Sequence, residues 1–204
     1  MFDARLRPFI DPPLNRLGRV VARAGVSANQ ITIAGGVLGV LAGAMIAEGR
    51  YGWGLALILA SRLLDGLDGA VARATKTTDL GGYLDILVDF VFYVAIPVGF
   101  GLADPENARF ALLLVASFTL TGVSFLAFAT IAAKRGLETA AHGKKSFFYS
   151  TGIAEGTETI AAFLLMCLAP AWFPAIATVY AILCLLTVAQ RTVAAAALFR
   201  DGKD

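Results

Sequence analysis

The sequence has 204 residues, of which 58% are hydrophobic and only 16% are charged, and its formal net charge is +2. This composition excludes an ordinary water-soluble domain, and nothing in the near-neutral charge indicates a nucleic-acid partner. The length fits one membrane domain, residues 1–204, and leaves no room for a second domain.

The first expected element is an amphipathic helix on the membrane surface, within residues 1–25. Five arginines share residues 3–23 with apolar side chains, which recur at three and four residues after Pro12-Pro13. Such a stretch is too charged to cross a bilayer, but it suits the interface between lipid and water.

Six further stretches, within residues 30–199, have the length and hydrophobicity of membrane spans. They run approximately over residues 30–47, 53–72, 80–102, 110–132, 151–169 and 172–199. The sequence therefore predicts an all-α integral membrane protein, in which an interfacial helix precedes a bundle of six transmembrane helices.

The positions of lysine and arginine predict the orientation of this bundle. They are frequent in the N-terminal segment, in the loops after the second and fourth spans and in the C-terminal tail, whereas the opposite loops contain only Arg50 and Arg109. Because lysine and arginine are enriched in cytoplasmic loops, we expect both termini in the cytoplasm, with a bacterial inner membrane as the location.

Four aspartates interrupt the second and third spans: Asp65, Asp68, Asp85 and Asp89. A carboxylate within the hydrocarbon costs about 2.5–3.5 kcal/mol on insertion scales, so a compensating partner is expected. Spacings of three and four residues keep each pair on one helical face. The two spans run in opposite directions, which places Asp68 and Asp85 at similar depth. Asp65 and Asp89 should lie about 5 Å deeper, below a cup of carboxylates that opens to the cytoplasm.

A thiol-free set of oxygen ligands suits Mg²⁺ or Mn²⁺, and four carboxylates are enough for two ions that handle a pyrophosphoryl group. Gly69, Gly81 and Gly82 border the cup and would let a bulky ligand approach the backbone. The alternative is that the aspartates only form buried pairs with Arg62 and Arg73. Two arginines would leave negative charge uncompensated, which favours the metal site.

The spacing of these residues resembles the signature of the CDP-alcohol phosphotransferase (CDP-alcohol phosphatidyltransferase) family, class I. All eight fixed positions are present: Asp65-x2-Asp68-Gly69-x2-Ala72-Arg73, then Gly81-x3-Asp85-x3-Asp89. The motif covers residues 65–89, while the six-span layout fits the family over nearly the whole chain.

The resemblance implies a dimeric membrane enzyme of phospholipid biosynthesis, which transfers a phosphatidyl group from CDP-diacylglycerol to an alcohol and releases CMP. It also implies that the four aspartates bind the metal ions and that Asp89 acts as general base. The residues expected to bind CDP are Asn29, Thr32, Asp68, Gly69, Ala72, Arg73 and Gly81. One departure is Ala28, which stands where the family usually has proline.

The candidates for acceptor binding are Lys134, Lys145, Glu155, Glu158 and Arg191. The basic residues suit an anionic acceptor such as glycerol 3-phosphate. The positive-inside rule, by which cytoplasmic loops are rich in lysine and arginine, explains the loop lysines equally well. Arg191 falls in an apolar stretch, where arginines usually face a cavity or a partner. The two glutamates could hydrogen-bond acceptor hydroxyls or neutralise Arg191, which keeps inositol, inositol phosphate, serine, another polyol or a lipid hydroxyl open as acceptors.

A divalent-cation carrier is the alternative from another class, since carriers also contain intramembrane acids. A carrier needs acidic residues along a path to the outer surface. No acid occurs between Asp89 and Asp104. The sequence therefore favours the transferase.

Overall fold

The computed structural model describes residues 3–136 and 152–200, with side chains from residue 10 onward, and this part of the chain contains no strand. Seven α-helices account for most of it: α1 (Asp3–Arg23), α2 (Ala28–Ala47), α3 (Tyr51–Ala74), α4 (Asp79–Ala103), α5 (Ala108–Lys134), α6 (Gly156–Leu168) and α7 (Phe173–Arg200). Short 3₁₀ turns over Pro105–Asn107 and Pro170–Trp172 precede α5 and α7. The all-α prediction is confirmed.

Four helical segments are long and apolar enough to cross a membrane: Ala28–Ala47, Asp79–Ala103, Pro105–Lys134 and Pro170–Arg200. Helix α3 has 24 residues but includes two arginines and two aspartates, and α6 has only 13 residues. At 1.5 Å per residue, α6 is about 20 Å long, which is shorter than the hydrocarbon core.

Helix α6 begins later than the expected span over residues 151–169. The segment just before it is fixed to α7, because the backbone N–H groups of Ile153 and Ala154 donate to Oγ1 of Thr187 at 3.2 and 3.0 Å. Those N–H groups are therefore satisfied outside a helix. The prediction that residues 152–155 are helical was wrong.

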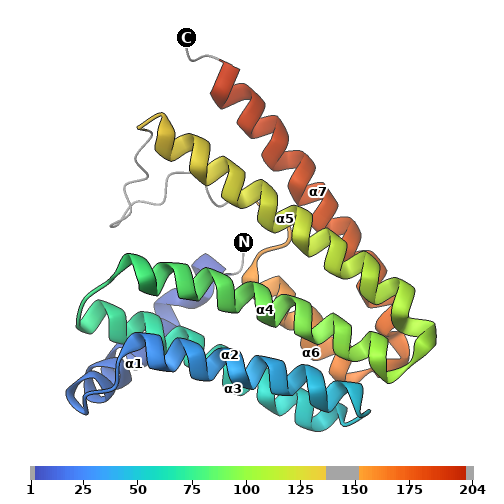
Figure 1. Ribbon diagram of the computed structural model, residues 1–204, viewed down its shortest axis with the longest axis horizontal. Coiled ribbons are helices and arrows are strands. Elements are labelled where there is room, and N and C mark those ends of the chain that lie inside the picture. The colour runs from blue at the N-terminus through green and yellow to red at the C-terminus, as the bar shows by residue number, and fades with distance from the viewer. Residues whose placement is uncertain (1–2, 137–151, 201–204) are drawn as a thin grey trace.

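Helix α2 packs against both α3 and α4, and α5 packs against α7 and α4. Figure 1 shows α2, α3 and α4 running side by side, while α5 and α7 cross them as a diagonal pair. Helix α6 contacts α3 and α7, so it joins the two groups of helices.

Close approach of α2 to α4 depends on two glycines. A Cβ at Gly43 would lie 2.5 Å from the backbone oxygen of Ala95, and one at Gly99 would collide with the backbone of Gly43. Because only glycine leaves room for this backbone contact, the pair fixes the distance between the two helices. This contact also helps to fix where α4 presents its aspartates.

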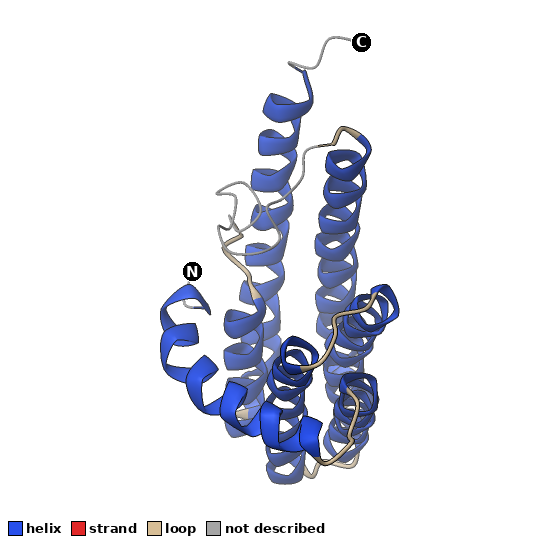
Figure 2. Ribbon diagram, turned by 90° about the vertical axis from the view of Figure 1, so that its left-hand side faces the viewer, coloured by secondary structure: helices blue, strands red, loops and turns tan. Residues whose placement is uncertain are grey.

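Helix α1 lies across the end of the bundle, as Figure 2 shows from that side. It packs on α3, where a Cβ at Gly18 would meet Ala70 at 2.8 Å. Leu14 and Val21 of α1 cover a small apolar cluster that includes Leu67 and Val71. The helix runs from Asp3 through Pro12-Pro13 to Arg23.

Candidate active site

The four aspartates lie on the facing helices α3 and α4. Asp65 and Asp68 belong to the C-terminal half of α3, while Asp85 and Asp89 belong to the first turns of α4. Helix α4 begins after Thr78, whose Oγ1 accepts a hydrogen bond from the N–H of Gly81 at 3.0 Å. This N-cap fixes the register in which α4 carries its two acids.

A pocket of about 210 Å³, which we call pocket A, lies between the start of α2, the end of α3 and the start of α4. Asp68 and Asp85 both line it, one from α3 and one from α4. Its lining contains six of the seven residues expected to bind CDP: Asn29, Thr32, Asp68, Gly69, Ala72 and Gly81.

Two contacts order the polar side chains of pocket A. Thr32 donates a hydrogen bond from Oγ1 to Oδ2 of the buried Asp68 at 2.6 Å, which ties α2 to α3. The Asn29 side chain lies over Gly81, where an added Cβ would be 3.2 Å from Oδ1 of Asn29. The glycine therefore leaves space that a side chain would fill.

Arg73, the seventh residue expected at the CDP site, lies outside the pocket A lining. Its Nε and Nη2 donate to Oδ1 of Asn15 on α1 at 3.3 and 3.0 Å. A Cβ added to Gly69 would lie 3.2 Å from Nη1 of Arg73, so the guanidinium lies beside pocket A. The hydrogen-bond partner on α1 was not foreseen, because only the fold brings residue 15 to residue 73.

A second pocket of about 360 Å³, pocket B, lies among α4, α5, α7 and the segment before α6. It contains Asp89, Glu155 and Arg191, together with Tyr93 and Thr121. The Nη1 of Arg191 donates to the backbone oxygen of Thr121 at 2.9 Å and to Oγ of Ser124 at 2.7 Å. Pocket B thus combines a carboxylate of the aspartate cluster with polar residues from three other parts of the chain.

Arg62 contacts the two aspartates that were expected in the deeper layer. Its Nη1 donates to Oδ1 of Asp89 at 2.7 Å and lies 3.4 Å from Oδ1 of Asp65. The pairing of aspartates with Arg62 that we considered from sequence is therefore present. No such pair forms with Arg73, whose guanidinium bonds Asn15.

The donor set fits a hard divalent cation, because it consists of carboxylate oxygens gathered from two helices. Asp65 on α3 and Asp89 on α4 lie close to one another, because both contact the same nitrogen, Nη1 of Arg62. Within residues 3–136 and 152–200, however, no three acidic, histidine or cysteine side chains are arranged so that they could hold an ion. Two of the four carboxylates are turned toward Arg62 instead.

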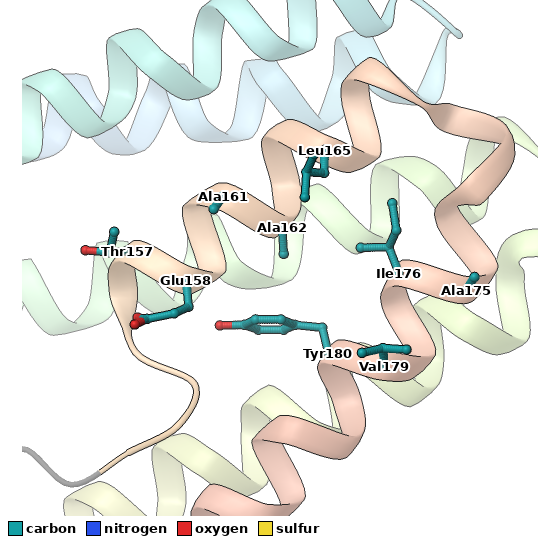
Figure 3. A pocket seen from close by; sticks show the side chains of 9 residues that line it. All are labelled: Thr157, Glu158, Ala161, Ala162, Leu165, Ala175, Ile176, Val179 and Tyr180. Carbon is teal, nitrogen blue, oxygen red and sulfur yellow. The ribbon is translucent and has the colours of Figure 1, made fainter. Parts of the chain in front are cut away.

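The other acceptor candidates are separated in space. Glu158 lines a largely apolar groove of about 600 Å³ between α6 and α7, at the same end as Tyr180 (Figure 3). Glu155 lines pocket B, so the two glutamates do not share a pocket. Lys134 is an exposed residue at the end of α5, and Lys145 lies outside the described residues.

Several lining residues were not predicted to be part of a site. Lys76 and Thr78 border pocket A, and Tyr93 and Thr121 border pocket B. Lys76 lies in the loop after the second expected span, three residues after Arg73, and this place beside the aspartate motif was a usable signal for a site role. Tyr93 lies four residues after Asp89, on the same face of α4, which was also a usable signal.

Comparison with known proteins places the chain among phosphatidyltransferases. The CDP-alcohol phosphatidyltransferase family model matches residues 25–200. The chain is 47% identical over 192 residues to inner membrane protein YnjF of Escherichia coli, an alignment that covers 94% of this chain and 93% of that protein. It is 36% identical over 101 residues to archaetidylinositol phosphate synthase of Pyrococcus horikoshii, covering 48% and 53% of the two chains.

Solved structures have the same fold. Phosphatidylinositol phosphate synthase (PgsA1) of Mycobacterium tuberculosis, crystallised with CDP-DAG bound, superposes with a TM-score of 0.66 at 22% identity, over 90% of this chain and 93% of that chain. The same enzyme in complex with manganese and citrate gives a TM-score of 0.63 at 20% identity, over 89% and 88%.

Proposed function

The chain belongs to the CDP-alcohol phosphatidyltransferase family, and we propose that it transfers a phosphatidyl group from CDP-diacylglycerol to a hydroxyl of a small alcohol. The observation that carries this proposal is the position of the carboxylates. Asp68 and Asp85 line pocket A, while Asp89 lines pocket B. One cluster of acids therefore borders both a candidate nucleotide pocket and a candidate acceptor pocket.

In this proposal the nucleotide end of the donor lipid occupies pocket A. Asn29, Thr32 and the glycines Gly69 and Gly81 supply polar contacts and space for it. The acceptor occupies pocket B, and its hydroxyl faces Asp89.

The reaction is a displacement at the β-phosphorus of the donor. The acceptor oxygen forms a bond to this phosphorus, the bond from the phosphorus to the oxygen of CMP breaks, and CMP leaves with that electron pair. Asp89 takes the proton of the attacking hydroxyl as general base. Phosphatidyl alcohol and CMP are the products.

Asp65, Asp68, Asp85 and Asp89 are the residues we propose as metal ligands, with two Mg²⁺ or Mn²⁺ ions as cofactor. When bound, such ions neutralise a pyrophosphate and stabilise the charge on a departing phosphate. The manganese complex of PgsA1, a protein with the same fold, supports a divalent ion in this fold.

The leading acceptor is glycerol 3-phosphate, and inositol phosphate is the second candidate. Arg191 places a guanidinium inside pocket B, which suits a phosphate group. Glu155 in the same pocket suits hydroxyl groups, so a polyol that also carries a phosphate matches both residues. Relatives that are synthases of archaetidylinositol phosphate and phosphatidylinositol phosphate support the inositol compound.

The purified protein should be incubated with CDP-diacylglycerol, Mg²⁺ or Mn²⁺, and separate alcohols: glycerol 3-phosphate, inositol phosphate, inositol, serine and glycerol. The expected result is release of CMP with formation of the phosphatidyl ester of one phosphorylated alcohol. Absence of CMP with every alcohol and both ions would contradict the proposed function. A product formed only with an unphosphorylated alcohol would contradict the role of Arg191.

We also propose how the protein sits in the membrane. As a single domain, α1 lies at the cytoplasmic interface, and α2 to α7 form six spans in an inner membrane, with both termini and the site in the cytoplasm. The distribution of lysine and arginine and the name of the E. coli relative support this arrangement. The functional unit proposed is a homodimer.

A further inference from the structure

Arg62 lies outside the aspartate motif, yet it occupies the middle of the carboxylate cluster. Its side chain is only 9% exposed, while those of Asp65 and Asp89 are 35% and 31% exposed. One nitrogen, Nη1, contacts both carboxylates, at 3.4 and 2.7 Å. The same cation thus neutralises part of the charge of α3 and of α4.

Besides the two carboxylates, two contacts hold the guanidinium in this position, and a third fixes one of these partners. It stacks on the ring of Phe92 at 3.9 Å, and Nη2 donates to Oγ of Ser61 at 3.2 Å. Oγ of Ser61 donates in turn to the backbone oxygen of Gly35 at 2.8 Å, which links the arrangement to α2. Arg62 is therefore a built part of the site rather than a surface residue that meets an acid by chance.

The hydrogen bonding of Arg62 is incomplete. Its Nε is buried and has no hydrogen-bond partner among the described residues. A buried charged group with an unsatisfied donor is unfavourable unless nearby groups of opposite charge stabilise it. The charge that explains this position is that of Asp65 on α3 and Asp89 on α4, which both contact Nη1 of Arg62.

We propose that Arg62 is a resident cation of the carboxylate cluster, which competes with divalent ions for Asp65 and Asp89. It satisfies the two acids when no ion is bound, and it releases at least Asp89 when an ion binds. This inference rests on the proposed function, because it takes the four aspartates as the metal ligands. It also accounts for the orientation of Asp65 and Asp89 toward Arg62 rather than toward a point shared with Asp68 and Asp85.

The test measures Mn²⁺ binding to the purified full chain by electron paramagnetic resonance, without substrate. We expect Arg62→Gln to bind Mn²⁺ about tenfold or more tightly than the native protein, because a positive charge beside the ion is removed. Arg62→Lys retains the charge and should bind Mn²⁺ with an affinity near the native one. Arg109→Gln is the matched control, because Arg109 also lies over an aromatic ring, Phe110 at 4.6 Å, but outside the cluster.

Equal or weaker Mn²⁺ binding by Arg62→Gln would overturn the proposal. If this variant folds only when Mn²⁺ is present during purification, the ion replaces the missing cation and the proposal is supported. If it does not fold even then, Arg62→Lys decides, since binding more than tenfold weaker than native would show that Arg62 assists the ion. If neither the native protein nor Arg62→Gln binds Mn²⁺, the metal site itself has failed, and the proposed function fails with it.

Discussion

Among single residues, Thr32 has the most direct effect on the geometry of pocket A, through its hydroxyl group. It donates to Oδ2 of Asp68 at 2.6 Å, and Asp68 is buried, with 6% of its surface exposed. Hydrogen bonds to charged groups contribute about 1.5–3 kcal/mol, so this bond is strong enough to decide the orientation of the carboxylate.

Removing this hydroxyl should therefore impair the donor site. We expect Thr32→Val to lower kcat/KM for CDP-diacylglycerol by about tenfold or more, because Asp68 loses the partner that orients it. Thr192→Val is the control, since Thr192 is exposed and its hydroxyl bonds the carbonyl of Val188 in its own helix. Equal kinetics for both variants would show that Thr32 does not position Asp68.

Two neighbouring glycines give a second comparison at the same scale. A Cβ at Gly81 would lie 3.1 Å from Oγ1 of Thr78 and 3.2 Å from Oδ1 of Asn29, whereas a Cβ at Gly82 would meet nothing within 4 Å. We expect Gly81→Ala to raise KM for CDP-diacylglycerol by several-fold and Gly82→Ala to raise it less, because the methyl group at Gly82 meets no protein atom even though Gly82 also lines pocket A. Similar values for the two variants would indicate that the space over Gly81 is not used.

At the scale of the helices, the α2–α4 contact controls where the acids of α4 lie. In Gly43→Ala the new Cβ would be 2.5 Å from the backbone oxygen of Ala95, so α4 would have to move. We expect a loss of about 1–3 kcal/mol in unfolding free energy, visible as a lower Tm in detergent. In Gly52→Ala the added Cβ meets nothing within 4 Å, and its Tm should match the native one or exceed it.

Most helix boundaries could be predicted from sequence, because hydrophobic runs determine where a chain crosses lipid. The third expected span, residues 80–102, corresponds to Asp79–Ala103, and the fourth, residues 110–132, to Ala108–Lys134. The start of α6 could not be predicted, since residues 152–155 are apolar enough for a helix. The N–H groups of Ile153 and Ala154 bond Thr187, a partner 34 and 33 residues away that only the fold supplies.

For the site too, local spacing could be predicted from sequence, whereas contacts between distant residues could not. The three- and four-residue spacings predicted that each pair of aspartates would share a helical face. The local sequence could not predict that one guanidinium, Arg62, would contact Asp65 and Asp89 together. Nor did it predict that Arg73 would bond Asn15 of α1. These contacts depend on how α1, α3 and α4 pack.

At the scale of the whole molecule, the orientation in the membrane follows from charge and can be measured by cysteine labelling. Cys167 and Cys184 are buried, so the native chain should react little. We expect a membrane-impermeant maleimide to label Glu106→Cys in intact spheroplasts, because residue 106 lies in a predicted outer turn. Val26→Cys, between α1 and α2, should be labelled only after lysis. The reverse pattern would contradict the proposed topology.

The central claim is that Asp89, on the border of pocket B, accepts the proton of the attacking alcohol. The most direct measurement is CMP release from CDP-diacylglycerol by Asp89→Asn, with the preferred alcohol and saturating Mn²⁺. We predict a fall in kcat of at least about a hundredfold, while the variant stays folded and still binds the donor lipid. Undiminished CMP release by Asp89→Asn would contradict the account.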